Sequence, residues 1–238
     1  MTSIEISDSA LSDGIRPTRL TYDALTDDGA PAAYMVPAAT LVSALFASIE
    51  GEPSVTWIAP AEAESLSLGK HSADIALRDG SHISASLVVA ADGRTSKLRD
   101  AAGITTLRRG YDQTGIVATV KFGEPHNGVA IQHFLPGGPF AILPLKDNRA
   151  CITWSAAREE AARVTALDDE GFLAELDLRI GGRFGSIALD GPRQSWPLDI
   201  VVPRELIAPR FALIGDAAHG VHPVAGQGVN LAFRDAAA

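Results

Sequence analysis

The sequence predicts an α/β fold of mixed α+β character, in which a layered α/β unit is interrupted by a β-rich unit. Two runs, "SLVVAAD" at 86–92 and "RFALIGD" at 210–216, are almost wholly apolar without alternation, as in strands covered on both faces inside a parallel sheet. From about Thr114, short strands follow one another with Gly and Pro between them, a pattern typical of antiparallel sheets. The sequence is therefore expected to form a layered α/β unit first, then a β-rich unit, and to return to the α/β unit at its end.

Local patterns predict the elements of the first hundred residues. Apolar residues at helical spacing predict one amphipathic helix at 39–51, which ends at Gly51. Strands are predicted at 2–8, at 54–60 and at 73–85, the last being a hairpin that turns at Asp79-Gly80.

The β-rich part is predicted from four strands, one helix and an extended segment. The helix spans 167–181, with Asp168 or Asp169 as its N-cap and Gly181 as its C-terminal stop. The predicted strands lie at 115–122, 129–135, 139–145 and 150–156, and the extended segment at 186–198.

Composition excludes several classes of function. The 238 residues are 46% hydrophobic and carry a formal net charge of −9, without any Lys/Arg cluster, which argues against nucleic acid as a partner. The single cysteine, Cys151, allows no internal disulfide and lies in a strand-like run. No secretory leader and no apolar run of membrane-spanning length is visible. A cytoplasmic protein, associated with the inner membrane at most peripherally, is expected.

The segment 88–103, "VVAADGRTSKLRDAAG", is the first candidate site. A buried strand ends at Asp92-Gly93, and Ser96 is placed to cap a helix that begins near Lys97. Ligands of open α/β sheets bind beyond the carboxyl ends of the strands, so this helix start, with Arg94 and Arg99, could face a phosphate. The alternative is a plain strand-turn-helix with solvent-facing polar residues.

The closing segment, "FALIGDAAHGVHPVAGQGVNLAFRDAAA", is the second candidate site. Asp216 ends a strand and could accept hydrogen bonds from a ribose, while Gly226, Gly228 and the small Ala225 would let the backbone approach a flat ring. Asn230 could supply an amide to the same ring. A lone Gly-x-Gly can also serve only a tight turn. His219 and His222 have no Cys or carboxylate at ligand spacing, so no metal is expected.

These motifs carry a family resemblance. "VVAADGRTSKLR" resembles the DG motif, and "ALIGDAAHGVHPVAGQGVNLAFRDAAA" the GD motif, of the class A flavoprotein aromatic hydroxylases, the para-hydroxybenzoate hydroxylase family. Together with "GPFAILPL" and "ACITW", the closing motif is similar to the branch that hydroxylates the ring of ubiquinone precursors.

The resemblance implies an FAD-dependent monooxygenase that uses NAD(P)H and O2 to hydroxylate an aromatic ring. The substrate that it implies is a polyprenyl phenol intermediate of ubiquinone biosynthesis. It implies a partial FAD-binding Rossmann-like domain at 1–104, a β-sheet substrate domain at 105–209 and a return to the FAD-binding domain at 210–238. Pro223 matches the proline beside the reactive flavin face. The implied cofactor-binding residues are Asp92, Gly93, Arg94, Gly215, Asp216, Gly226, Gln227, Gly228, Val229 and Asn230.

The sequence also departs from the family. It contains no G-x-G-x-x-G unit and ends soon after the GD motif, and Pro37-Ala38-Ala39 replaces a polar stretch that touches the flavin in the family. An internal fragment is therefore expected, inactive by itself, with an open sheet edge that a homodimer or a partner could cover. The alternatives are a non-catalytic module that binds a ligand or partner, and a related flavin reductase such as a geranylgeranyl reductase. A flavin halogenase is disfavoured because Trp-x-Trp-x-Ile is absent.

Overall fold

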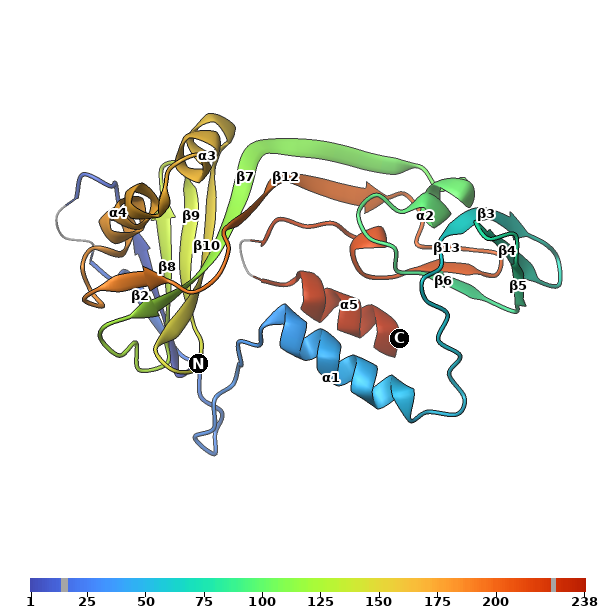
Figure 1. The fold of residues 1–238 in the computed structure, drawn as a ribbon, viewed down its shortest axis with the longest axis horizontal. Helices are drawn as coiled ribbons and strands as arrows, with labels where there is room; N and C mark the ends of the chain where they lie inside the picture. Colours follow the sequence, from blue (N-terminus) through green and yellow to red (C-terminus); the bar gives the residue numbers. More distant parts are fainter. Residues whose placement is uncertain (14–16, 224–225) are drawn as a thin grey trace. The chain divides into compact units, whose positions relative to one another are not determined.

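The computed structural model describes the whole chain except residues 14–16 and 224–225 (Figure 1). The chain forms two compact units, and each combines segments that are distant in sequence. The first unit comprises Met1–Glu52 and Asp112–Pro197, and the second comprises Pro53–Tyr111 and Leu198–Ala238.

One large sheet organises the first unit, in the strand order β11-β7-β10-β9-β8-β1-β2, with β12 also paired to β7. The pairs from β11 to β8 are antiparallel, whereas β1 runs parallel to β8. The strands are β1 (Ser3–Asp8), β2 (Leu20–Asp23), β7 (Thr106–Phe122), β8 (Val129–Leu135), β9 (Gly138–Pro144), β10 (Arg149–Ala157), β11 (Ile187–Leu189) and β12 (Gln194–Pro203).

Two helices, α3 (Arg158–Thr165) and α4 (Asp169–Ile180), pack against this sheet. Phe172, Leu176 and Ile180 of α4 join a core of aliphatic and aromatic side chains from β7 to β10. The predicted ends of α4 are confirmed, because the Asp168 carboxylate accepts from the Gly171 N–H at 2.9 Å and Gly181 adopts a left-handed conformation. A further helix, α1 (Ala38–Glu50), has no buried residue.

The described part of the second unit contains two small sheets and two α-helices. β6 (Val88–Ala90) pairs in parallel with β14 (Phe211–Leu213), as the two apolar runs predict, and β13 (Ile207–Ala208) pairs with β14 on its other side. The remaining elements are β3 (Ala63–Leu68), β4 (Ala73–Leu77) and β5 (His82–Ala85), the helices α2 (Lys97–Ala101) and α5 (Gly228–Ala237), and the short 3-10 turn η1 (Gly215–Ala217).

Three features differ from the expectations. The strand predicted at 54–60 is wrong, since these residues form no strand and the side chains of Trp57 and Ile58 are exposed. The helix α3 was not predicted. The structure also groups residues 1–52 with 112–197 and not with the following residues up to 104, because β1 pairs with β8. Among the described residues, the helices are all too short or too polar to cross a membrane.

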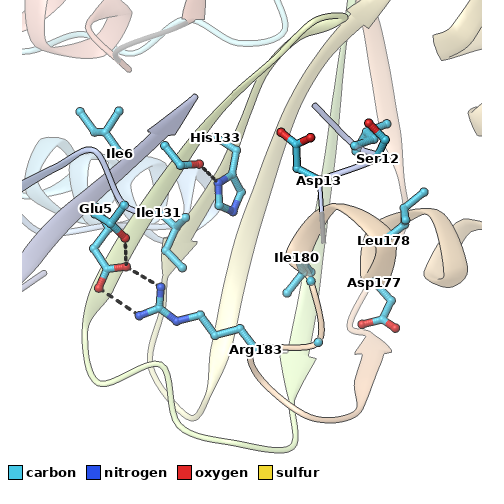
Figure 2. A pocket seen from close by; sticks show the side chains of 15 residues that line it. Glu5, Ile6, Ser12, Asp13, Ile131, His133, Asp177, Leu178, Ile180 and Arg183 are labelled. Atoms are coloured by element: carbon cyan, nitrogen blue, oxygen red, sulfur yellow. Dashed lines mark hydrogen bonds and ion pairs between the residues drawn. The ribbon is translucent and has the colours of Figure 1, made fainter. Parts of the chain in front are cut away.

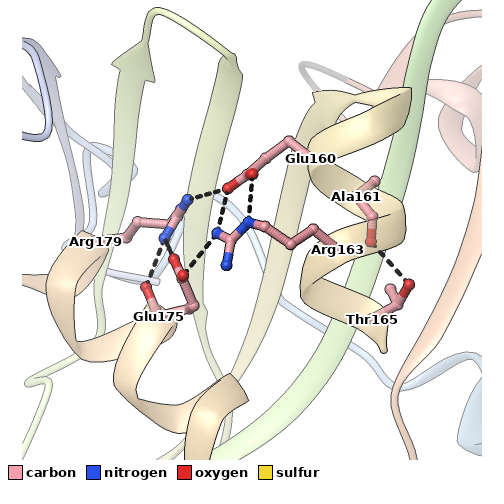
Figure 3. A network of polar contacts seen from close by, with 6 residues as sticks. All are labelled: Glu160, Ala161, Arg163, Thr165, Glu175 and Arg179. Atoms are coloured by element: carbon pink, nitrogen blue, oxygen red, sulfur yellow. Dashed lines mark hydrogen bonds and ion pairs between the residues drawn. The ribbon is translucent and has the colours of Figure 1, made fainter. Parts of the chain in front are cut away.

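A charged network joins α3 to α4 (Figure 3). The Arg179 side chain is only 4% exposed, its guanidinium lies 3.8 Å from the centre of the Trp154 ring, and it pairs with Glu175 and Glu160. Arg163, which is half exposed, pairs with the same two carboxylates. Burial alone would raise the pKa of Glu175, but hydrogen bonds from Arg163 and Arg179 outweigh it and lower the pKa. The buried charge of Arg179 thus depends on its two carboxylate partners.

We expect Glu175→Ala to lower the free energy of unfolding by about 2–3 kcal/mol, because it leaves the Arg179 charge buried with one fewer partner. Arg163→Ala is the matched control, since it removes an exposed partner of the same carboxylates and should cost less than about 1 kcal/mol. Urea unfolding followed by tryptophan fluorescence measures both. Equal losses in the two variants would contradict this assignment.

Candidate functional site

The DG segment forms a capped turn between β6 and α2. The Asp92 carboxylate accepts from the Ser96 hydroxyl and from the Leu98 N–H, and the Ser96 hydroxyl accepts from the Arg99 N–H at 3.0 Å, so the predicted cap is confirmed. Gly93 supplies the positive φ of +86° that this turn requires. Arg99 does not face an open ligand site: it is buried and donates to the carbonyls of Arg94 and Ala217.

Arg94 links three segments of the second unit. Its Nε donates to Asp216 Oδ2 at 3.0 Å, and its Nη1 donates to both the carbonyl and Oδ1 of Asp199, at 2.8 and 2.9 Å. Its Nη2 donates to the Val221 carbonyl at 2.8 Å. Burial works against the charge of Arg94, but the two carboxylates more than compensate and raise its pKa above the ordinary value. The guanidinium is thus held in one orientation.

The GD segment turns sharply after β14. Gly215 has φ +59°, and η1 then presents Asp216, whose side chain remains 44% exposed. Asp216 Oδ1 lies 3.9 Å from the position that a Cβ on Gly228 would occupy. The exposed carboxylate is therefore beside the first residue of α5.

The start of α5 carries uncapped backbone N–H groups. The Leu231 N–H donates to the Gln227 carbonyl at 2.9 Å, whereas the N–H groups of Gly228, Val229 and Asn230 have no acceptor among the described residues. Helix N-termini of this kind attract electron-rich groups. Gly226, with φ +59°, leaves open space where a side chain would stand. Ala225 lies outside the described residues.

Pro223 and the two histidines occupy the same stretch. The Pro223 carbonyl accepts from the Gly226 N–H at 3.0 Å. The His222 ring packs edge-on against Tyr111, with 5.0 Å between ring centres, and burial, followed by the positive charge of Arg94, lowers its pKa. Both effects favour the neutral form of the His222 imidazole. In the described part of the chain, no three His, Cys, Asp or Glu side chains come together as metal ligands.

A carboxylate that the sequence analysis did not single out fastens α5 to the GD turn. Asp235 Oδ2 accepts from the Gly215 N–H at 2.8 Å and from His219 Nε2 at 2.6 Å. An acidic residue in the last turn of a helix opposes the helix dipole, so its position was a signal for a partner elsewhere in the chain. Asp199 was also missed, because its strand context indicated nothing about its two arginine partners.

The first unit contains a cavity of about 460 Å³, and Figure 2 shows the side chains that line it. Its polar groups pair with one another: the Ser7 hydroxyl is hydrogen-bonded to His133 Nδ1, and Arg183 Nη2 donates to Glu5 at 3.0 Å. That contact with Arg183 lowers the pKa of Glu5. None of the sequence-predicted site residues is among the described residues that line it.

Comparison with known proteins identifies the family. A family model described as an FAD binding domain matches residues 8–238. The chain belongs to the FAD-binding flavoprotein monooxygenase family. The resemblance carried by the DG and GD motifs and the predicted α/β fold are therefore confirmed.

Individual relatives agree with this assignment. The ubiquinone hydroxylase UbiL of Rhodospirillum rubrum is 41% identical over 232 residues, covering 98% of this chain and 54% of that protein. The mitochondrial ubiquinone biosynthesis monooxygenase COQ6 of Homo sapiens is 36% identical over 195 residues, covering 68% and 42% respectively. The chain spans about half the length of the curated relatives it matches.

Among solved structures, the fold is similar to PqsL, a probable FAD-dependent monooxygenase from Pseudomonas aeruginosa. The TM-score is 0.78 at 25% identity, over 100% of this chain and 66% of that one.

The residues of the second unit fit part of an FAD molecule. Asp216 offers a carboxylate oxygen that no described residue engages, and α5 offers three N–H donors for which the described residues supply no acceptor. Gly226 and Gly228 keep side chains out of this space. Arg94, by contrast, has four protein acceptors for its five N–H donors, so little of it is left for a phosphate.

Asp235→Ala should loosen α5, because the Gly215 N–H and the His219 ring both lose their acceptor. We expect the free energy of unfolding to fall by about 1–3 kcal/mol. Hydrogen exchange followed by mass spectrometry should show faster exchange in α5 and in η1. Arg234→Ala, which alters the neighbouring residue of the same turn, is the control. Unchanged hydrogen exchange in Asp235→Ala would show that the contacts of Asp235 with Gly215 and His219 do not hold α5 in place.

We expect the free energy of unfolding to fall at acid pH, in part because Asp199 becomes protonated. Burial would raise its pKa, but hydrogen bonds from Arg94 and Arg108 outweigh burial and place the folded pKa below the ordinary 3.8. A lowered folded pKa gives stability that is complete above pH 3.8 and is lost as the pH falls through the folded value. Urea unfolding at pH 5 and pH 3 should therefore show a smaller pH effect in Asp199→Asn than in the unaltered chain. An identical pH effect in both proteins would contradict the prediction.

Proposed function

We propose that this chain holds the flavin side of an FAD-dependent monooxygenase that hydroxylates an aromatic ring, using NAD(P)H and O2. The observation that carries the proposal is the exposed carboxylate of Asp216 beside the start of α5, where three N–H groups have no acceptor in the described part of the chain. A carboxylate accepts hydrogen bonds from ribityl hydroxyls, and helix N–H donors suit the electron-rich carbonyl edge of a flavin ring.

Each residue has a defined part in this proposal. Asp216 Oδ1 would accept from the ribityl chain, and the N–H groups of Gly228, Val229 and Asn230 would orient the ring. Gly215, Gly226 and Gln227 shape the backbone around it, and Pro223 would shield the reacting face from water. Asp92 and Gly93 hold the neighbouring turn. When bound, the flavin supplies the redox and oxygen-transfer chemistry.

The proposed substrate is a phenol with a polyprenyl tail, as in ubiquinone biosynthesis. Its support is the 41% identity to a protein named ubiquinone hydroxylase and the 36% identity to ubiquinone biosynthesis monooxygenases. PqsL, similar in fold, has been solved with the aromatic compound 2-aminobenzoylacetate. The large sheet of the first unit would provide the substrate domain. Such a substrate would be drawn from a membrane surface, so we propose peripheral association.

FAD binding is the first test. At a concentration about one hundred times its Kd, FAD should stabilise the chain by roughly 2.7 kcal/mol in thermal unfolding. Asp216→Ala should abolish most of the shift, because the ribityl chain loses its acceptor. Glu205→Ala, which removes an exposed acid from the same unit, should leave the shift unchanged. No shift in the unaltered chain would refute the proposed flavin site.

Turnover tests the reaction itself. The FAD-loaded chain is supplied with NADH or NADPH, ¹⁸O2 and a prenylated phenol, and mass spectrometry measures the ¹⁸O content of any ring-hydroxylated product. Because the chain is expected to be inactive by itself, FAD should bind without a labelled product being formed. A ring-hydroxylated product that contains one ¹⁸O atom would overturn this expectation and demonstrate the proposed reaction directly.

A further inference from the structure

We propose that Asp199 is a positioning residue of the flavin site, which sets the orientation of the Asp216 carboxylate through Arg94. The proposal rests on the proposed FAD site and goes beyond it, because Asp199 lies on β12, outside both the DG and the GD motifs. Asp199 acts on the cofactor only through Arg94 and Asp216.

Asp199 is a well-held anchor. Its side chain is 13% exposed and both of its carboxylate oxygens are engaged. Oδ1 accepts from Arg94 Nη1 at 2.9 Å, and Oδ2 accepts from Arg108 Nε at 2.6 Å. The Asp199 carbonyl adds a second acceptor for Arg94 Nη1 at 2.8 Å. Arg94 is therefore hydrogen-bonded to both the side chain and the backbone of Asp199.

The hydrogen bonds between Arg94 and Asp199 determine the direction of the Arg94 Nε–H group. A guanidinium is planar, so acceptors on its two terminal nitrogens fix the direction of the third N–H. Asp199 holds Nη1, the Val221 carbonyl holds Nη2 at 2.8 Å, and Nε is left directed at Asp216 Oδ2, 3.0 Å away. Asp216 itself is 44% exposed. Without that bond its carboxylate could rotate among several rotamers, and Oδ1 would no longer be kept towards α5.

Backbone pairing between the GD segment and β12 supports the contacts of Arg94. Gly220 and Val201 exchange two backbone hydrogen bonds of 2.9 Å, which join the GD segment to β12. A Cβ on Gly220 would stand 3.1 Å from the Val201 Cβ and 3.3 Å from the Arg94 Cγ. A side chain at this position would be packed more tightly than most real contacts, so its neighbours would have to shift by a few tenths of an ångström. The same pairing places the Val221 carbonyl within reach of Arg94.

A double-mutant cycle tests the proposal, with the FAD dissociation constant measured by flavin fluorescence. Asp199→Asn and Asp216→Asn should each weaken FAD binding by about tenfold, which corresponds to about 1.4 kcal/mol. If Asp199 acts through Asp216, adding Asp199→Asn to Asp216→Asn should weaken binding no further. A general structural defect would instead give additive losses, and circular dichroism checks that each variant is folded.

Two further variants sharpen the result. Glu205→Ala, which removes an exposed acid of the same unit, is the control, and FAD binding should change by less than about twofold. Arg94→Lys keeps the positive charge but cannot hold Asp199, Val221 and Asp216 together. It should therefore weaken binding about as much as Asp199→Asn, and it replaces that variant in the cycle if Asp199→Asn does not fold.

The outcomes separate the two proposals. If the unaltered chain does not bind FAD, the proposed function fails and the role of Asp199 fails with it. If the unaltered chain binds FAD but the losses are additive, or Asp199→Asn binds normally, only the role of Asp199 is refuted. Non-additive losses together with normal FAD binding in Glu205→Ala support it.

Discussion

The candidate site depends on one guanidinium. Arg94, in the turn after β6, binds the strand β12 and the GD turn, both of which lie more than one hundred residues further along the chain. A half-buried positive charge is tolerated here because two carboxylates and two carbonyls surround it. Loss of Arg94 would leave Asp216 without the contact that orients it. The position of the exposed carboxylate is therefore a property of this assembly and not of the GD turn alone.

A second attachment acts on the same turn from its other side. Asp235 binds the Gly215 N–H and the His219 ring, whereas Arg94 binds Asp216. The short 3-10 turn η1, which follows β14, is thus held by two charged groups: the Arg94 guanidinium binds Asp216, and the Asp235 carboxylate of α5 binds Gly215. A site that is ordered before its ligand arrives loses less conformational entropy on binding. These two contacts provide such order in a stretch rich in glycine, the residue with the most freedom to lose.

Sequence patterns predicted what local interactions determine. The caps at Ser96, Asp168 and Gly181 each depend on residues within one helical turn, and all three are present. Pairing partners were less accessible: the pattern of 2–8 indicated a strand, but it could not show that this strand pairs with β8. The contact between Arg94 and Asp199 joins residues 105 positions apart, and neither residue type implies the other. The sequence motifs therefore indicated candidate site residues, but they did not indicate the contacts that organise them.

The strand β12 gives this organisation a mechanical consequence. It begins with Gln194 in the first unit and ends with Pro203 in the second, and it carries Asp199 between them. Since Asp199 holds Arg94 by side chain and backbone, a shift of β12 along its own axis would move the guanidinium and, through it, Asp216. The orientation of the Asp216 carboxylate therefore depends on the position of β12, through the hydrogen-bonded side chains of Asp199 and Arg94.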